Sequence, residues 1–273
     1  MSYRMIAVDM DGTLLNSKKE ISDKNREALI YAKEKGVKIV IATGRLYTSA
    51  KWYAKLIGVN VSLISCNGAQ IREEEFGDVI YFNFLDKEKC YKVLDICQKY
   101  DVYYQYFSET TVYTDKRSYS SVRYVKWNEM IPVEERVPIK VVEDNYKNIE
   151  NLDEGILKFL IISNNYALLN KIRDELAEDN IFELTKSLID NVEVVNKGVS
   201  KGRALEILSG YYNIPKDEII AIGDNENDLS MIKFAGLGIA MGNSTELIKL
   251  NADYITKSND EDGVASAIYE FIK

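Results

Sequence analysis

Short apolar runs alternate with amphipathic stretches along the first part of the chain. The apolar runs are of strand length and cover residues 5–8, 37–41 and 61–65. The stretches between them predict helices over residues 22–35 and 47–56. Ser22 is suited to cap the first of these helices and Gly36 to end it. This alternation predicts an α/β fold with a doubly wound, parallel sheet of the Rossmann-like kind.

The same alternation returns near the end of the chain. Helices are predicted from residues 200, 228 and 263 and over 245–250, and strands over 218–222, 237–240 and 254–256. From about residue 84 the pattern is less regular and rich in aromatic residues, with a strand over 155–162 and a helix over 166–177. We therefore expect a discontinuous core domain of residues 1–83 and 188–273 and an inserted α+β domain of residues 84–187.

Composition narrows the class of protein. The chain has 273 residues, of which 46% are hydrophobic and 29% charged, so it can bury a sizeable core. The net charge of −8 argues against binding to nucleic acid or to an anionic membrane. The chain also lacks a run of about 18 apolar residues, the length that could span a bilayer. Three cysteines without metal-ligand spacing, and a start without a signal peptide, favour the cytoplasm.

The chain contains no histidine. This excludes Ser-His-Asp and Cys-His catalysis and every zinc site that is built on histidine. If the protein is an enzyme, its chemistry depends on carboxylates, lysine and a hard metal ion.

Two aspartates directly follow the first apolar run. Asp9 and Asp11 belong to the segment Asp-Met-Asp-Gly-Thr. The packing of a buried strand does not explain two charged residues directly after it. Open parallel sheets bind their ligands at the carboxyl ends of the strands, and Gly12 allows a tight turn there. The alternative is an N-capping aspartate in a surface turn, since Asp-Gly is common in turns. The position of the pair favours a ligand site.

Two other segments carry groups that suit a phosphoryl oxygen. Thr43 and Gly44 offer a hydroxyl and an unhindered backbone N–H, although the threonine could simply cap a turn. Lys201 falls in the first turn of a helix capped by Ser200, where the helix dipole disfavours a cation unless an anion is bound there. A solvated surface lysine is the alternative, and Lys197 nearby could serve the same purpose.

A second acidic strand end follows residues 218–222. Residues 224–228, Asp-Asn-Glu-Asn-Asp, place three carboxylates and two amides within five positions. Oxygen-rich groups of this kind bind Mg²⁺. Alone, the segment could merely cap the next helix. Because parallel strands end at one edge of a sheet, Asp9, Asp11 and Asp224 can converge there and form a metal site.

These groups predict phosphoryl transfer. A carboxylate that attacks a phosphate dianion needs cations to neutralise the like charges, and Mg²⁺ and Lys201 can provide them. Asp9 would be the nucleophile and would form an aspartyl-phosphate. Asp11 would protonate the leaving oxygen and later deprotonate water, and its pKa would have to be raised for the first role.

The order of these motifs resembles the haloacid dehalogenase-like (HAD) superfamily, in its Cof-type sugar-phosphatase branch. The matching segments are Asp9–Leu15, Thr43–Arg45, Asn67–Ala69, Gly198–Gly202, Gly223–Asp228, Ala240–Asn243 and Glu261–Ala265. The resemblance spans Tyr3 to Lys273. It implies a HAD core domain whose inserted α+β domain is a C2-type cap.

The resemblance also implies a role for each motif residue. It makes Asp9 the nucleophile and Asp11 the acid/base. The implied Mg²⁺ ligands are Asp9, the backbone carbonyl of Asp11, Asp224 and, in support, Asp228. The implied phosphate contacts are Thr43, Gly44, Lys201 and Asn227. The implied activity is a Mg²⁺-dependent phosphatase of small phosphorylated metabolites, with sugar phosphates foremost.

Two other functions would use the same residues or the same fold. A phosphosugar mutase or phosphotransferase shares the aspartyl-phosphate, and a non-catalytic regulator could bind a phosphometabolite without turnover. The complete set of motifs speaks against the regulator. The tyrosine-rich inserted domain could stack on a sugar or flavin-like ring, but packing in a small domain explains such residues more often. The sequence leaves the substrate and the oligomeric state open.

Overall fold

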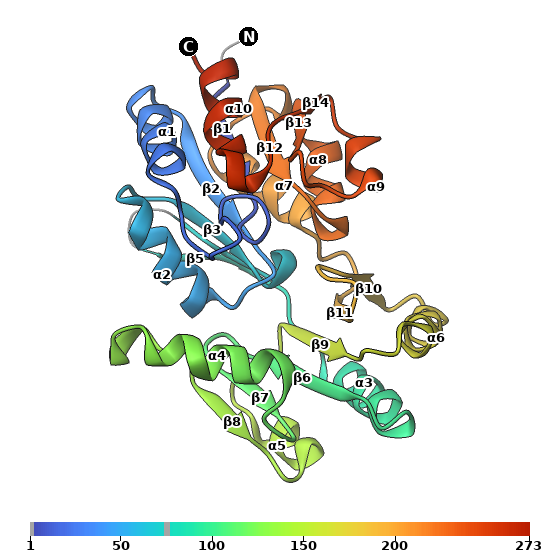
Figure 1. Ribbon diagram of the computed structural model, residues 1–273. Coiled ribbons are helices and arrows are strands. Elements are labelled where there is room, and N and C mark those ends of the chain that lie inside the picture. Colours follow the sequence, from blue (N-terminus) through green and yellow to red (C-terminus); the bar gives the residue numbers. More distant parts are fainter. Residues whose placement is uncertain (1–2, 74–76) are drawn as a thin grey trace. The chain divides into compact units, whose positions relative to one another are not determined.

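Two separate sheets account for the change of pattern along the sequence. The computed structural model describes residues 3–73 and 77–273 and divides the chain into two units (Figure 1). The first unit comprises Met1–Arg45, Ala50–Tyr81 and Ser200–Lys273, and the second comprises Leu46–Ser49 and Phe82–Val199. The expected end of the inserted domain at residue 187 is too early. The second unit continues to Val199, because strand β11 (Asn191–Asn196) pairs with β9 (Lys158–Ile162) and β10 (Phe182–Thr185) of its sheet.

The first unit contains an eight-stranded sheet with the order β14-β13-β12-β1-β2-β3-β4-β5. Its strands are β1 (Met5–Val8), β2 (Lys38–Ala42), β3 (Ser62–Ser65), β4 (Gln70–Arg72), β5 (Val79–Phe82), β12 (Ile219–Gly223), β13 (Leu237–Ala240) and β14 (Tyr254–Ile255). All pairings from β14 to β3 are parallel, which confirms the doubly wound sheet that the sequence predicts. β4 runs antiparallel to β3, an extension that the apolar pattern did not reveal.

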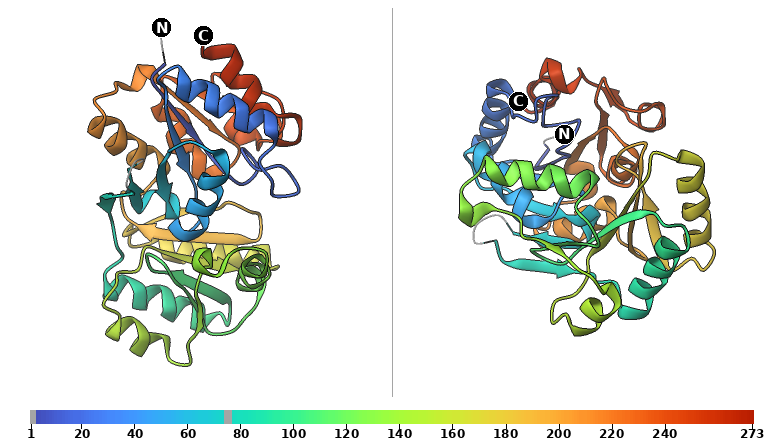
Figure 2. Two further views of the ribbon diagram at one scale, coloured as in Figure 1. Left: turned by 90° about the vertical axis from the view of Figure 1, so that its left-hand side faces the viewer. Right: turned by 60° about the horizontal axis from the view of Figure 1, so that its bottom comes forward.

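Helices cover both faces of this sheet. They are α1 (Asp23–Glu34), α2 (Tyr47–Ile57), α7 (Lys201–Tyr211), α8 (Leu229–Phe234), α9 (Glu246–Lys249) and α10 (Gly263–Phe271). The chain moves from β1 to β3 in one direction along the sheet and from β12 to β14 in the other. Right-handed crossovers therefore place α1 and α8 on opposite faces. Met5 and Ala7 of β1 share a core with Leu205 and Leu208 of α7, and α1 and α10 lie side by side on the other face (Figure 2).

The second unit contains a six-stranded sheet with the order β10-β11-β9-β6-β7-β8. Its remaining elements are β6 (Tyr103–Phe107), β7 (Val112–Thr114), β8 (Ile139–Val141), α3 (Lys87–Lys99), α4 (Tyr119–Glu129), α5 (Asn145–Asn151) and α6 (Tyr166–Ala177). Tyr104, Tyr106 and Tyr113 pack in a core with apolar side chains of α3, α5 and α6. For these three tyrosines the structure supports packing rather than ligand stacking.

Short 3₁₀ turns complete the described chain. They are η1 (Cys66–Gly68), η2 (Val133–Glu135), η3 (Lys216–Glu218), η4 (Glu226–Asp228) and η5 (Asn259–Glu261). Over residues 3–73 and 77–273, each helix is too short or too polar to cross a membrane.

The parallel register of the first sheet determines where its functional side chains meet. β1 pairs with β12 on one side and with β2 on the other, so the three strands end at the same edge. The residues that follow them are Asp9, Thr43 and Asp224. The carboxyl edge of the sheet thus gathers the polar segments that the sequence singles out.

Candidate active site

Asp9 lies where the central strand β1 reaches the edge of the sheet. Its backbone N–H donates to the carbonyl oxygen of Ile222 in β12 (3.0 Å), so the ladder between these strands extends to this residue. Gly12 follows with a φ of +87°, and a Cβ atom there would lie 2.5 Å from Oδ2 of Asp224. Only glycine allows both this turn and this close approach. The glycine lets the two acidic strand ends come into contact.

Lys201 is fully buried at the start of α7. Its Nζ lies 2.6 Å from Oδ1 of Asp9 and 2.6 Å from Oδ1 of Asp228. Burial acts to lower the pKa of Lys201, but the two carboxylates outweigh it and raise that pKa. Lys201 is therefore an internal ammonium group and not a solvated surface lysine. Lys197, the alternative, lies in the second unit, where its Nζ is 3.1 Å from Glu183.

The loop after β12 supplies two carboxylates to the same cluster. Oδ2 of Asp228 accepts the backbone N–H groups of Asp224 (2.9 Å) and Asn225 (3.1 Å), while its Oδ1 faces Lys201. Thr13 donates from Oγ1 to Oδ1 of Asp224 (2.9 Å). Asp228 thus holds its own loop and belongs to the charged cluster, while its side chain makes no capping hydrogen bond to α8, the role that the simpler interpretation of the segment gives it.

The carboxylates of this cluster crowd one another. Burial raises the pKa of Asp9 well above its usual value, and the charge of Asp228 raises it further. Burial and Asp228 likewise raise the pKa of Asp224 to about 7. Ligand oxygens of Asp9, Asp224 and Asp228 lie within 4.8 Å of one another. An all-oxygen donor set with this surplus of negative charge fits a hard divalent cation, so these three aspartates are able to hold a metal ion.

The carboxylate of Asp11 has two cationic partners. Arg45 donates to it from Nε (2.6 Å) and Nη2 (2.8 Å), and Lys19 donates from Nζ (2.9 Å). Burial acts to raise the pKa of Asp11, but Arg45 and Lys19 outweigh it and hold this pKa well below its usual range. A general acid needs the opposite shift, so the structure presents Asp11 as a carboxylate, the form of a general base.

Two residues around Asp11 were not assigned a role from the sequence. Arg45 stands in the Thr-Gly-Arg segment, and its guanidinium also lies over the ring of Tyr53, 4.6 Å from the centroid. Lys19 lies in the loop before α1, and no sequence pattern there indicates its contact with Asp11.

The remaining expected phosphate contacts lie at neighbouring loops. Oγ1 of Thr43 accepts the backbone N–H of Arg45 (3.1 Å), as a turn-capping threonine would, and Gly44 belongs to the same turn. Asn227 donates from Nδ2 to Oδ1 of Asn67 (3.2 Å). The backbone N–H of Asn67 in turn donates to the carbonyl oxygen of Thr43 (3.0 Å). Asn67 therefore connects the loop after β2 with the loop after β12.

The predicted site residues fall into three groups in the structure. Asp9, Lys201 and Asp228 form one buried cluster, and the half-buried Asp224 lies beside it. The side chain of Asp11 is held by its own cations, and Thr43 and Asn227 are linked through Asn67.

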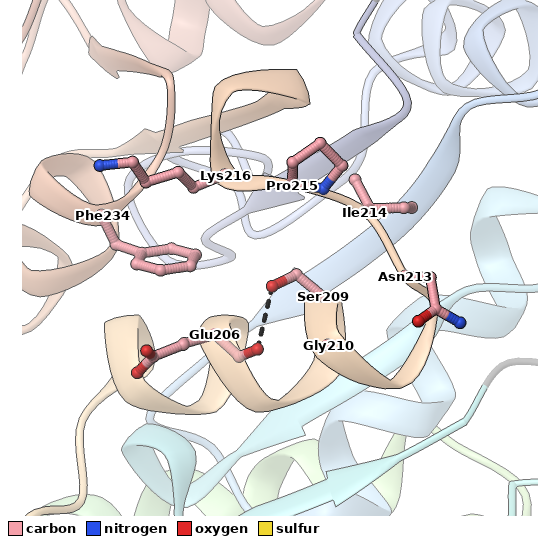
Figure 3. A pocket seen from close by; sticks show the side chains of 8 residues that line it. All are labelled: Glu206, Ser209, Gly210, Asn213, Ile214, Pro215, Lys216 and Phe234. Atoms are coloured by element: carbon pink, nitrogen blue, oxygen red, sulfur yellow. Dashed lines mark hydrogen bonds between the residues drawn. The ribbon is translucent and has the colours of Figure 1, made fainter.

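The first unit also has a pocket of about 550 Å³ (Figure 3), and the predicted site residues are not among those that line it. It is lined by the end of α7, which includes Gly210, and by the segment Asn213 to Lys216 that leads toward β12. At about 1.5 Å per residue, Gly210 lies about 14 Å along α7 from Lys201. Because α7 starts at the carboxyl edge of the sheet and returns to the start of β12, this pocket belongs to the opposite edge.

Curated relatives match the chain over nearly its whole length. Phosphatase YwpJ of Bacillus subtilis is 33% identical over 281 residues, which cover 96% of this chain and 97% of that protein. The 5-amino-6-(5-phospho-D-ribitylamino)uracil phosphatase YcsE of the same species is 32% identical, over 100% of this chain and 97% of that protein.

Solved structures and a family model agree with these matches. A haloacid dehalogenase-like hydrolase from B. subtilis has a TM-score of 0.89 at 29% identity, over 98% of this chain and 100% of that one. Another from Bacteroides thetaiotaomicron has a TM-score of 0.84 at 33% identity, over 99% of this chain and 100% of that one. The model of the haloacid dehalogenase-like hydrolases matches residues 6–268. The chain belongs to this family, as the order of its motifs indicates.

Proposed function

We propose that the chain is a Mg²⁺-dependent phosphatase that hydrolyses phosphomonoesters of small metabolites through an aspartyl-phosphate on Asp9. The observation that carries this proposal is the buried Asp9–Lys201–Asp228 cluster at the carboxyl edge of the sheet, with Asp224 beside it. A carboxylate in direct contact with a buried ammonium group is suited to meet a phosphate dianion, because the cation offsets the repulsion between the two anions.

The proposed reaction has two steps. A carboxylate oxygen of Asp9 attacks phosphorus, the bond from phosphorus to the ester oxygen breaks, and the leaving oxygen takes a proton from Asp11. Water then attacks phosphorus, gives a proton to Asp11, and releases phosphate and free Asp9. Lys201 neutralises charge on the phosphoryl oxygens in both steps.

Other residues bind the phosphoryl group and the metal in this proposal. Thr43, Gly44 and Asn227 donate to phosphoryl oxygens. Asp9, Asp224 and Asp228, with the backbone carbonyl of Asp11, would hold Mg²⁺, which when bound supplies positive charge to the phosphoryl group.

The state of Asp11 adds one requirement to the first step. Asp11 can donate a proton only after it has taken one up, and its pairs with Arg45 and Lys19 oppose this. The side chain of Asp11 is 39% exposed, so solvent already weakens these pairs. We infer that one or both pairs loosen when substrate binds.

The substrate is proposed as a class. One relative is named for a phosphorylated ribityl compound, which supports a small, hydroxyl-bearing phosphomonoester. Sugar phosphates are the first candidates. Cys66, Cys90 and Cys97 are buried and are not joined by disulfides in the described part of the chain, which supports work in the reducing cytoplasm.

A panel of phosphomonoesters tests the proposal. Purified protein with Mg²⁺ should release inorganic phosphate from at least one sugar phosphate and from 4-nitrophenyl phosphate, and chelation of the metal should stop this. Asp9→Asn should fold and lose turnover, and acid quenching should trap a phosphoprotein only in the wild type. Asp23→Asn is the matched control, because the side chain of Asp23 is 84% exposed and lies outside the cluster.

Two results would count against the proposal. An isomerised sugar phosphate without free phosphate would make the protein a mutase. Failure to turn over any compound in a broad panel would favour a binding protein.

A further inference from the structure

The segment Cys66–Gly68 after β3 has an unusual backbone that the proposed chemistry leaves unexplained. Its three residues have consecutive positive φ values of +48°, +59° and +104°. Residues other than glycine rarely adopt this region, and such conformations persist only where the surroundings enforce them. The contacts of this turn therefore point to a role.

The turn touches two of the loops that carry the proposed phosphate contacts. The backbone N–H of Cys66 donates to the carbonyl oxygen of Arg45 (2.9 Å), and that of Asn67 donates to the carbonyl oxygen of Thr43 (3.0 Å). At Gly68, a Cβ atom would lie 2.4 Å from the carbonyl oxygen of Ser200, directly before Lys201. Only glycine lets the turn fit so closely against the start of α7.

The side chain of Asn67 reaches the third loop. It is 2% exposed, and its Oδ1 accepts a hydrogen bond from Nδ2 of Asn227 (3.2 Å), which is 7% exposed. The NH₂ group of an amide carries two N–H bonds in one plane. When one N–H of Asn227 points to Asn67, the direction of the second is fixed as well.

We propose that Asn67 is a positioning residue of the phosphate site, which acts by orienting the amide of Asn227 toward the phosphoryl group. This rests on the proposed function, in which Asn227 donates to phosphate. The backbone of the same turn keeps the loops of Thr43 and Lys201 in register with that amide. Asn67 itself does not touch the substrate in this proposal.

A double-mutant cycle tests whether Asn67 acts through Asn227. The variants are Asn67→Gly, Asn227→Ala and the double variant, and the measured quantities are the Kd for inorganic phosphate with Mg²⁺ and the kcat and KM for 4-nitrophenyl phosphate. Glycine suits the positive φ at position 67, so it removes the side chain without adding backbone strain.

Each single variant should weaken phosphate binding about tenfold, the effect of one misdirected hydrogen bond to a charged group. KM should rise by a similar factor with a smaller change in kcat. The double variant should bind phosphate within about twofold of Asn227→Ala alone, because Asn67 has nothing left to orient. The control is Asn213→Gly, a second asparagine with positive φ (+53°), which lines the pocket at the opposite edge and should keep wild-type values.

Asn67→Asp covers the case in which Asn67→Gly does not fold. Aspartate tolerates the left-handed region and keeps an acceptor oxygen for Asn227. Its added charge can weaken phosphate binding, but this effect is the same in Asn67→Asp and in the double variant with Asn227→Ala, so it cancels when the two are compared. When Asn227→Ala is added to the Asn67→Asp variant, it should therefore still cost about tenfold in phosphate affinity.

Three outcomes would overturn the inference. Wild-type phosphate affinity in Asn67→Gly would show that the contact is not needed. Additive losses in the double variant would show that Asn67 acts independently of Asn227. A wild-type protein that neither binds phosphate nor turns over any phosphomonoester would overturn the proposed function together with this inference, whereas the first two outcomes leave the proposed function intact.

Discussion

Lys201→Met removes the cation that directly contacts Asp9 and Asp228. Both distances are 2.6 Å and the lysine is 0% exposed, so solvent cannot replace the lost charge. At an effective dielectric constant of about 20, each pair is worth about 6 kcal/mol in Coulomb energy. Much of this is offset, because the ammonium group no longer has to be desolvated. Methionine is unbranched and of similar length, which limits the cavity. Loss of one partner of a buried ion pair costs about 3–5 kcal/mol, and we expect a destabilisation in this range near pH 8.

The same variant should be much closer to wild type near pH 5. The pKa of Asp9 is already raised by burial in the wild type, and Lys201 opposes that rise. Without the lysine, the folded-state pKa of Asp9 rises further. A group whose pKa is higher in the folded state contributes stability below its unfolded pKa, about 3.9, and loses it as the pH rises through the folded value. Because the pKa of Lys201 is raised, the lysine stays protonated up to at least about pH 10, so the wild type keeps this positive charge beside Asp9 and Asp228 at both pH 5 and pH 8.

Urea unfolding in a metal chelator at pH 5 and pH 8 measures both effects. Lys18→Met is the control, since Lys18 is an exposed lysine in the same unit and should change the free energy of unfolding by less than about 0.5 kcal/mol. A loss below about 1 kcal/mol at pH 8, or an equal loss at both pH values, would refute the reasoning that Lys201 balances buried carboxylates.

Three other predictions concern glycine packing, metal binding and the second unit. Gly202→Ala should lower the free energy of unfolding by about 2 kcal/mol or more, because its Cβ would lie 2.4 Å from a carbonyl oxygen of α8. Gly210→Ala on the same helix meets nothing within 4 Å and should raise the free energy of unfolding by about 0.5–1 kcal/mol. Urea midpoints of the two variants that move in the same direction would contradict this. The raised pKa of Asp224, about 7, means that its stabilising contribution is complete below about pH 4 and is lost as the pH rises through 7, where the carboxylate becomes available to metal. The rise in Tm on addition of Mg²⁺ should therefore be larger at pH 8 than at pH 5, and equal rises would argue against this ligand. Glu193→Gln should cost about 3–5 kcal/mol in urea unfolding, because it removes the charge that Lys158 faces at 2.9 Å in a buried pair, and a loss below about 1 kcal/mol would contradict this.

Much of the core unit could be predicted because its pattern is local. Buried parallel strands appear as short apolar runs, and each carboxyl end is marked by a change to polar residues. The rule that parallel strands end at one edge then brings Asp9, Thr43 and Asp224 together without any knowledge of side-chain positions. Lys201 was singled out for a related but different reason. Its place in the first helical turn suggested an anionic ligand, whereas the structure supplies the carboxylates of Asp9 and Asp228 as its immediate partners.

Two features that depend on long-range pairing were not predicted. The boundary at residue 187 failed because the sequence pattern did not predict a strand over residues 191–196, and the pairing of β11 with β9 and β10 assigns that segment to the second sheet. The contact between Asn67 and Asn227 joins residues that are 160 positions apart, and a left-handed asparagine has no apolar periodicity that could reveal it.

Asp11 shows why a motif can identify a residue and still leave its chemical state undetermined. The spacing of Asp9 and Asp11 suggests two roles, but the acid and base forms of Asp11 differ only in one proton. That proton depends on Arg45, 34 positions away, and on Lys19, 8 positions away. Both pairs favour the carboxylate, which in the proposed reaction is the form needed when water attacks and the wrong form for the leaving oxygen. That reaction therefore requires ion pairs that are strong enough to orient Asp11 and weak enough to release it, and the partial exposure of Asp11 is what makes that balance physically reasonable.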